Sequence, residues 1–121
     1  MVCPIIHVIT LTFVLHAVPT DAPTDVSVIA TSPFTIAISW SPPNTPNGFI
    51  VSYTLYVSSS SVTTTRNQQL LDFVMGEFTP YERVSVRVSA STKIGEGPQS
   101  EPVIVYTQET SKSTIKKDLK F

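Results

Sequence analysis

A bulky aromatic residue, a proline-rich turn and a second aromatic residue follow one another closely at Trp40, residues 42–48 and Tyr53. Proline has no backbone N–H to donate to a sheet, so Pro42 and Pro43 end a strand that carries Trp40. The Asn-Gly step that follows tolerates the positive φ angles of a tight turn. This order predicts one strand that ends at the tryptophan, a turn, and an antiparallel return strand that carries the tyrosine.

Alternation of apolar and polar residues, typical of half-buried strands, extends over most of the chain. In the clearest run, residues 34–40, Phe34 shares one parity with the isoleucines and Trp40. Leu71 begins a later run of the same kind. Residues 58–65 are polar and β-branched, which indicates an exposed edge strand or loop. About seven such runs, separated by turn residues roughly every 8–12 positions, predict an all-β, seven-stranded antiparallel sandwich. The side chains expected in its core are Ile36, Ile38, Trp40, Tyr53, Leu55, Phe73, Val86 and Val88.

The composition suits one such domain without disulfides. The chain has 121 residues, of which 41% are apolar, and its ten prolines against four glycines fit short strands joined by stiff turns. The single cysteine, Cys3, can form no internal disulfide, so the fold must rest on its hydrophobic core. The net charge is −1 and only 14% of residues are charged. Nucleic-acid binding, which needs clustered basic residues, is therefore not expected.

The chain divides into four expected segments. Residues 1–17 hold an apolar run of signal-peptide length, with Ala17 as the small residue for cleavage, and we expect a signal peptide there. The alternative is an alternative-exon or read-through start attached to a domain of a longer protein. Residues 18–23 are expected to be a linker, 24–107 the domain and 108–121 a flexible polar and basic tail. Because the apolar run is shorter than the roughly 20 residues that span a bilayer, we expect membrane attachment only through a longer parent protein.

Several independent landmarks in residues 22–107 resemble those of a fibronectin type III domain. Trp40 and the prolines after it match strand B of that family, and Tyr53 matches the start of strand C. Residues 78–80 (Phe-Thr-Pro) match the element before strand F, and residues 95–100 (Gly-Glu-Gly-Pro-Gln-Ser) match the F–G turn. The resemblance implies an immunoglobulin-like sandwich of seven strands.

The chain departs from this family at one structural position. The tyrosine that normally anchors the corner between strands E and F is replaced by Val84. Tyr81 lies on the opposite strand parity, so it is not expected to take over this role. Loss of one hydrogen bond costs about 0.5–1.5 kcal/mol, which predicts a looser corner in an intact fold.

A finer resemblance points to repeats from long fibronectin type III arrays. Residues 30–43 and 88–102 are similar to repeats of receptor-type tyrosine phosphatases, those of type Q above all. The cysteine-containing catalytic loop of the phosphatases has no counterpart in this sequence. The resemblance implies a secreted or extracellular location, as in the ectodomain of a membrane receptor. It also implies contacts with a protein partner or with neighbouring fibronectin type III repeats.

The expected domain lacks the residues that most catalysis requires. His7, His16 and Cys3 all precede it, which leaves no Ser-His or Cys-His nucleophile and no zinc site of ordinary type. Its carboxylates are scattered singly, and no acidic cluster suits calcium. We therefore expect no enzyme activity, no metal and no cofactor.

The loop between strands F and G is the candidate contact surface, because loops on a rigid scaffold commonly carry recognition. Its candidate contact residues are Lys93, Ile94 and Glu96, although the same residues would also serve simply to make a turn. Arg83 and Arg87 alternate with inward-facing valines, so we expect them to share one exposed face of strand F.

Three functions stay open at this point. The leading one is a non-catalytic extracellular interaction or spacer module, derived from an arrayed cell-surface receptor as a short isoform or fragment. The second makes the chain an ectodomain fragment of a receptor-type tyrosine or phosphoinositide phosphatase whose catalytic domain is absent here. The third is a truncated product with no function of its own.

Overall fold

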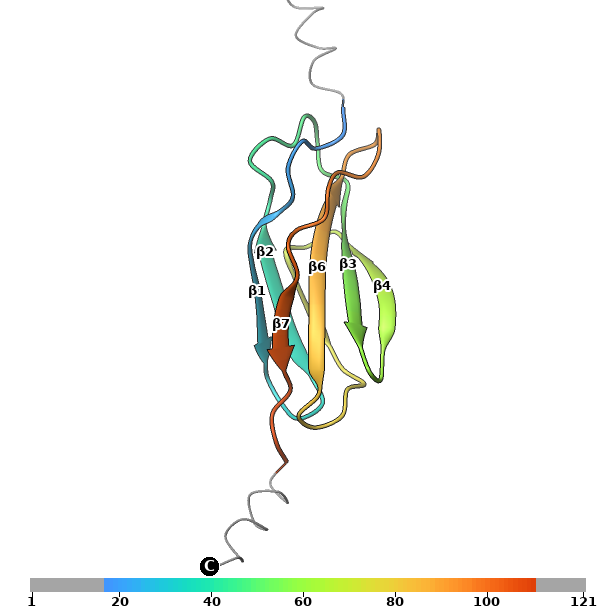
Figure 1. Cartoon of the computed structure of the whole chain (residues 1–121). Helices are drawn as coiled ribbons and strands as arrows, with labels where there is room; N and C mark the ends of the chain where they lie inside the picture. The colour runs from blue at the N-terminus through green and yellow to red at the C-terminus, as the bar shows by residue number, and fades with distance from the viewer. Residues whose placement is uncertain (1–16, 111–121) are drawn as a thin grey trace, which may run out of the picture.

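Seven strands and no helix make up residues 17–110, the part of the chain that the computed structural model describes (Figure 1). The prediction of an all-β antiparallel sandwich is thereby confirmed. The strands are β1 (Thr24–Ala30), β2 (Ile36–Ser41), β3 (Ser52–Ser59), β4 (Thr63–Gln68), β5 (Asp72–Met75), β6 (Arg83–Ser91) and β7 (Val103–Tyr106). Apart from Ala17, the expected signal peptide lies outside the described residues, as does the tail from residue 111 onward.

The strands form two antiparallel sheets. One sheet has the order β1-β2-β5 and the other the order β4-β3-β6-β7, so strands far apart in sequence become neighbours. The chain enters the sandwich at one end and leaves it at the other (Figure 1). We call the end with the β2–β3 and β6–β7 loops the N-terminal pole and the opposite end the C-terminal pole.

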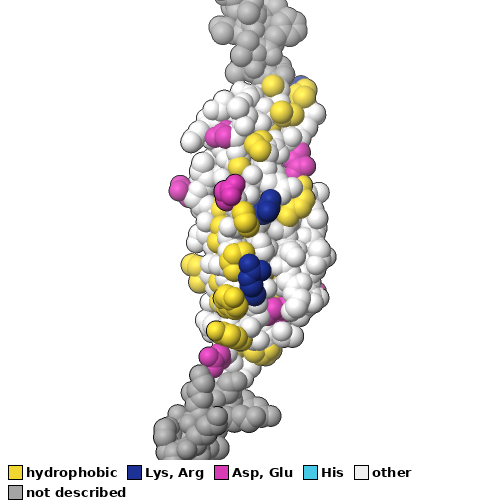
Figure 2. Space-filling view, in the orientation of Figure 1, with side chains coloured by type: hydrophobic (Ala, Val, Ile, Leu, Met, Phe, Trp, Pro, Cys, Tyr) yellow, Lys and Arg dark blue, Asp and Glu magenta, His cyan; other side chains and the backbone are white. Residues whose placement is uncertain are grey.

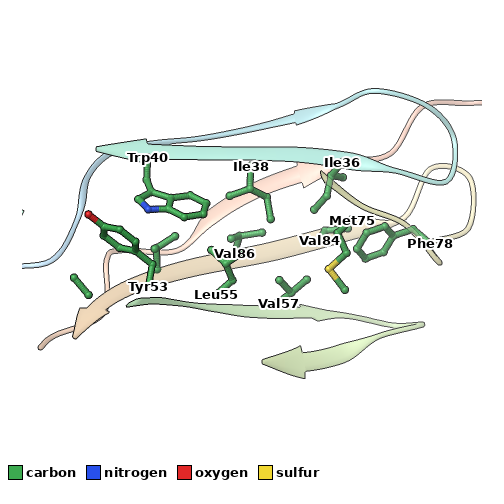
Figure 3. Close-up of a cluster of buried hydrophobic side chains, with 12 residues drawn as sticks. Ile36, Ile38, Trp40, Tyr53, Leu55, Val57, Met75, Phe78, Val84 and Val86 are labelled. Carbon is green, nitrogen blue, oxygen red and sulfur yellow. The ribbon is translucent and has the colours of Figure 1, made fainter. Parts of the chain in front are cut away.

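Alternate side chains of both sheets meet in one core (Figure 3). Trp40 of β2 meets Tyr53 of β3 edge to face, with ring centroids 5.6 Å apart and an interplanar angle of 60°, an arrangement that aromatic pairs favour. Of the eight side chains expected in the core, seven are buried, and Phe73 is half-buried against the cluster. Met75 and Phe78 close the core toward the C-terminal pole.

Two residues that the alternation placed on inward faces are exposed instead, so this part of the prediction was wrong. Phe34 is 51% exposed and Leu71 is 44% exposed. A turn holds Phe34 outside β2: the amide of Thr31 donates to the carbonyl oxygen of Thr35 at 3.1 Å, and the amide of Phe34 donates to Ser32 Oγ at 3.0 Å. A side chain in such a turn does not follow the period of the strand after it.

The polar stretch at residues 58–65 contains both a turn and an edge strand. β3 continues to Ser59, whose amide donates to the carbonyl oxygen of Val62 at 2.7 Å and closes the turn. β4 then returns along the edge of the four-stranded sheet.

Residues 18–23, expected to be a linker, are bound to the N-terminal pole. The Asp21 carboxylate accepts hydrogen bonds from the backbone amides of Asn44 and Thr45, each at 3.0 Å. Pro19 is fully buried. The segment is thus packed against the domain.

The corner between β5 and β6 has no tyrosine anchor. Val84 is completely buried in the core. Tyr81 is 65% exposed, and its ring packs on that of Tyr106 with centroids 5.4 Å apart.

Glu82 holds this corner together. Its buried carboxylate accepts hydrogen bonds from the backbone amides of Ser61 and Thr79, both at 2.7 Å, and from hydroxyl groups of the β3–β4 turn. Its own amide donates to Thr107 Oγ1 at 2.7 Å. Burial disfavours the charged form, but the hydrogen bonds outweigh it and hold the pKa of Glu82 well below its ordinary value. The buried carboxylate therefore links the turn to the corner, and the backbone of Glu82 joins the corner to the end of β7.

Candidate functional site

A groove at the N-terminal pole lies between the β2–β3 loop and the β6–β7 loop. Phe49 is 90% exposed beside it, with Ile94 at 55% and Val51 at 48%. Hydrophobic side chains also gather at this end in Figure 2. Grouped exposure of large apolar side chains marks a contact surface. The groove has a volume of about 200 Å³ and is lined by Asn47, Gly48, Phe49, Val51, Thr92, Lys93 and Ile94.

The β6–β7 wall of the groove has a fixed backbone. Thr92 and Gly95 exchange two backbone hydrogen bonds, at 3.0 and 3.2 Å. The hydroxyl of Thr92 accepts from the amide of Ile94 at 3.2 Å and donates to the carbonyl oxygen of Ala17 at 2.7 Å. These bonds hold the tip of the loop in place and connect it to the N-terminal segment.

Asn47 shapes the opposite wall. It has a φ of 60°, a left-handed value that asparagine tolerates better than most residues. Its side-chain amide donates to the carbonyl oxygen of Val18 at 3.0 Å and to Thr20 Oγ1 at 2.7 Å. Gly48 follows with a φ of 149°. The turn thus leaves Phe49 almost fully in solvent.

Glu96 lies outside the groove, although the sequence grouped it with Lys93 and Ile94. Its carboxylate accepts hydrogen bonds from the hydroxyls of Tyr56 and Ser89 on the four-stranded sheet. The bond from Tyr56, together with partial burial, raises the pKa of that phenol. Glu96 therefore attaches the loop to the sheet, while Lys93 and Ile94 line the groove.

Sequence reasoning missed the β2–β3 side of this site. Phe49 and Val51 directly follow an Asn-Gly turn, and both are exposed, whereas Ile50 between them is half-buried. An apolar run directly after a tight turn was the available signal. Which of its members faces solvent depends on the turn geometry.

The groove offers contact area and one charge but no reactive group. Lys93 is the charged residue in its lining. Within residues 17–110, no three His, Cys, Asp or Glu side chains are grouped so as to hold a metal ion. The same residues contain no helix with the length and apolar character needed to cross a membrane. The site can bury apolar side chains of a partner and pair a negative group with Lys93.

Two sheets with the strand orders described above define an immunoglobulin-like sandwich. The model of the "Fibronectin type III domain" family matches residues 21–106. The chain therefore belongs to the fibronectin type III family, as the landmarks in its sequence implied.

The chain is similar to parts of two much longer phosphatases. It is 31% identical over 93 residues to phosphatidylinositol phosphatase PTPRQ of Rattus norvegicus, which covers 76% of this chain and 4% of that protein. It is 38% identical over 95 residues to tyrosine-protein phosphatase Lar of Drosophila melanogaster, which covers 74% of this chain and 5% of that protein. The FN5 domain of Drosophila Lar has a solved structure that matches with a TM-score of 0.63 and 25% identity, over 77% of this chain and all of that domain. The chain thus spans a small fraction of these relatives, at the scale of one domain.

Proposed function

We propose that this chain is a non-catalytic extracellular protein-interaction module that binds its partner through the groove at the N-terminal pole. The observation that carries the proposal is the pair of large apolar side chains, Phe49 and Ile94, exposed at 90% and 55% on two facing loops. Exposure of this kind costs solubility, and a partner that covers both side chains removes that cost. Neighbouring fibronectin type III repeats and separate cell-surface proteins are both partners of the right kind.

The rigidity of the walls supports a binding role. The tip with Ile94 is fixed by the bonds of Thr92, and the turn before Phe49 is fixed by those of Asn47. A contact surface that is already ordered loses little conformational entropy when it binds. Buried aromatic and aliphatic anchors usually carry most of the energy of such contacts.

A cell-binding assay tests this role. The chain is displayed as a tetramer and applied to a panel of cells that express single receptor ectodomains. We expect the double variant Phe49→Ser/Ile94→Ser to lose binding to any ectodomain that the unmodified tetramer recognises. Phe34→Ser is the matched control, because Phe34 is also an exposed phenylalanine but lies in the β1–β2 turn at the C-terminal pole. Binding that survives the double variant, or is lost equally in the control, contradicts the proposal.

The extracellular location is tested by expression in mammalian cells and N-terminal sequencing of secreted protein. Support for it comes from the apolar run in residues 1–17 and from the similarity to receptor-type phosphatases. Secreted protein that begins at Val18 supports it, and intracellular protein that keeps Met1 contradicts it.

A second candidate function is favoured by the similarity to PTPRQ and Lar: the chain is an ectodomain piece of a receptor-type tyrosine or phosphoinositide phosphatase. Sequencing of full-length transcripts tests it. Transcripts that continue from this domain into further repeats and a phosphatase domain support this candidate, and transcripts that end after residue 121 contradict it.

A further inference from the structure

The strands of the two sheets carry charges of opposite sign. In the three-stranded sheet the charged strand residues are Asp25 and Asp72. In the four-stranded sheet they are Arg66, Arg83 and Arg87. All five side chains are exposed. The aspartates of the three-stranded sheet are therefore complementary in charge to Arg83 and Arg87 on the four-stranded sheet of a second molecule.

The acidic side chains lie beside an exposed apolar row. Ile29 of β1 is opposite Ala37 of β2, and Ala37 is opposite Val74 of β5, so the three residues cross the sheet in line. Ile29 is 61% exposed and Val74 is 65% exposed. Asp72 lies two positions before Val74 along β5. Asp25 lies where the pairing of β1 with β2 shifts register. We call Asp25, Ile29, Ala37, Asp72 and Val74 the acidic face.

The four-stranded sheet shows a similar arrangement with arginines. Arg83 of β6 is opposite Tyr106 of β7, and Arg87 is opposite Tyr56 of β3. Ile104, which is 41% exposed, lies one row away from Arg83. Basic and hydrophobic side chains lie next to one another over the β6 and β7 part of the surface in Figure 2. We call Tyr56, Arg83, Arg87, Ile104 and Tyr106 the basic face.

The charges on both faces are available to a partner. Within residues 17–110, neither the guanidinium of Arg83 nor that of Arg87 forms an ion pair, and the same holds for the carboxylate of Asp72. Of the two acids in the β6–β7 connection, Glu96 is engaged by the hydroxyls of Tyr56 and Ser89, and Glu101 is exposed. Tyrosine and arginine are also among the residues enriched where protein interfaces derive their binding energy.

We infer that the acidic face of one copy of this chain docks on the basic face of a second copy. The apolar row of Ile29 and Val74 covers Ile104 and Tyr106, and the aspartates pair with the arginines. Two different surfaces meet in this contact, so each copy in a pair keeps one face unused. The association therefore grows beyond a dimer, into a ring or a filament.

Sedimentation equilibrium of the full chain tests the inference, from about 10 µM to about 1 mM, the range of weak protein contacts. We expect the average mass to rise with concentration and to pass the mass of a dimer. Because the paired charges are at the surface, the rise should weaken when salt is raised from about 50 mM to about 500 mM. This salt dependence is measured on the unmodified chain alone.

Two double variants separate the faces. Arg83→Gln/Arg87→Gln removes the charge of the basic face, and Asp25→Asn/Asp72→Asn removes that of the acidic face. Each variant alone should associate at least about fivefold more weakly than the unmodified chain. A mixture of both should form one-to-one pairs and nothing larger, because each variant keeps a single intact face.

Arg66→Gln is the matched control. Arg66 is an exposed arginine of the same sheet, but it is opposite Leu55, on the parity that faces away from Tyr56. The Arg66→Gln variant should associate like the unmodified chain. Phe49→Ser/Ile94→Ser should also associate normally, which separates this contact from the groove at the N-terminal pole.

Three results would overturn the inference. The unmodified chain could stay a monomer at every concentration, or its mass could stop at that of a dimer. The third result is that Arg66→Gln weakens association as much as the double variants do. Melting temperatures confirm that the variants are folded. If a double variant fails to fold, the unmodified chain still tests the inference, through the average mass that it reaches at high concentration and the change of that mass with salt.

Discussion

The carboxylate of Glu82 is buried beside a corner at which many relatives of this fold place a tyrosine hydroxyl. It accepts hydrogen bonds from two backbone amides and from side-chain hydroxyls of Ser60, Ser61 and Thr79. The last of these residues is in turn linked to Thr107, whose hydroxyl donates to the carbonyl oxygen of Thr79 at 2.7 Å. Because hydrogen bonds to a charged group are worth more than neutral ones, this single side chain stabilises both the β3–β4 turn and the corner.

Replacement of the carboxylate by an amide tests its contribution. Glu82→Gln keeps the size of the side chain but places an NH₂ group against backbone amides that need an acceptor. We expect a loss of about 2 kcal/mol in the free energy of unfolding, measured by urea denaturation. Glu77→Gln is the matched control, since Glu77 is exposed and lies five positions earlier. A loss in the control equal to that in Glu82→Gln would contradict the assignment.

The same carboxylate gives stability a dependence on pH. The folded pKa of Glu82 lies well below the ordinary value of 4.5. Its contribution is therefore fully present above pH 4.5 and is lost as the pH falls toward the folded pKa. The melting temperature of the unmodified chain should drop between about pH 5 and about pH 2 more steeply than that of Glu82→Gln. If the melting temperatures of the unmodified chain and of Glu82→Gln fall in parallel with pH, other carboxylates cause the acid dependence.

Trp40 contributes to stability through packing alone. Its ring lies edge to face with Tyr53, and its indole N–H has no hydrogen-bond partner in the described structure. Trp40→Ala should lower the free energy of unfolding by about 3–5 kcal/mol, measured by circular dichroism during denaturation. Phe49→Ala removes an aromatic side chain that is 90% exposed and should change stability little. An unchanged melting temperature for Trp40→Ala would refute its place in the core.

At the scale of elements, the β6–β7 loop and the N-terminal segment are packed together. A Cβ added to Gly97 would lie 2.8 Å from Pro19 Cβ and 2.9 Å from its carbonyl oxygen, closer than such atoms approach. At Gly95 the contact is 3.2 Å, to a methyl group of Val18. The two glycines thus differ in how tightly they fix the segment.

This difference predicts unequal effects of two alanine substitutions. Gly97→Ala should cost about 1–3 kcal/mol, because backbone atoms of Pro19 must move. It should also speed hydrogen exchange at the amide of Thr20, which donates to the carbonyl oxygen of Thr45 at 3.1 Å. Gly95→Ala should do less, since the side chain of Val18 can rotate away. Equal effects would mean that the segment is not held by the loop.

Elements could be predicted from the sequence wherever a strand is buried on one face. Ile36, Ile38 and Trp40 alternate with the smaller Ala37 and Ser39 because one side of β2 meets the core, so period two is visible. Phe34 continues that parity in the sequence, but a turn places it in solvent. Of the residues that line the groove, Ile94 was a candidate contact residue because it lies in an evident loop. Phe49 was not a candidate, because nothing local shows which way its turn directs it.

The whole molecule is expected to unfold as one unit. Both sheets contribute to a single core, and the chain contains one cysteine, Cys3, so no disulfide within the chain can hold part of it. Urea denaturation followed by Trp40 fluorescence and by far-ultraviolet circular dichroism should give coincident curves. A reducing agent should leave the midpoint unchanged in a monomeric sample. Separate curves would show that the sheets unfold independently.

The sequence by itself determined the class of this protein: an antiparallel sandwich of the fibronectin type III family, with Trp40 and Tyr53 in its core. Alternation and turn residues are local signals, and they are enough to specify strands and their inward faces. The tertiary structure alone decided which distant residues meet. It brought Glu82 to the β3–β4 turn and Phe49 to the groove that Ile94 lines, and it placed acids on one sheet and arginines on the other. Such contacts join segments far apart in the chain, and no local pattern specifies them.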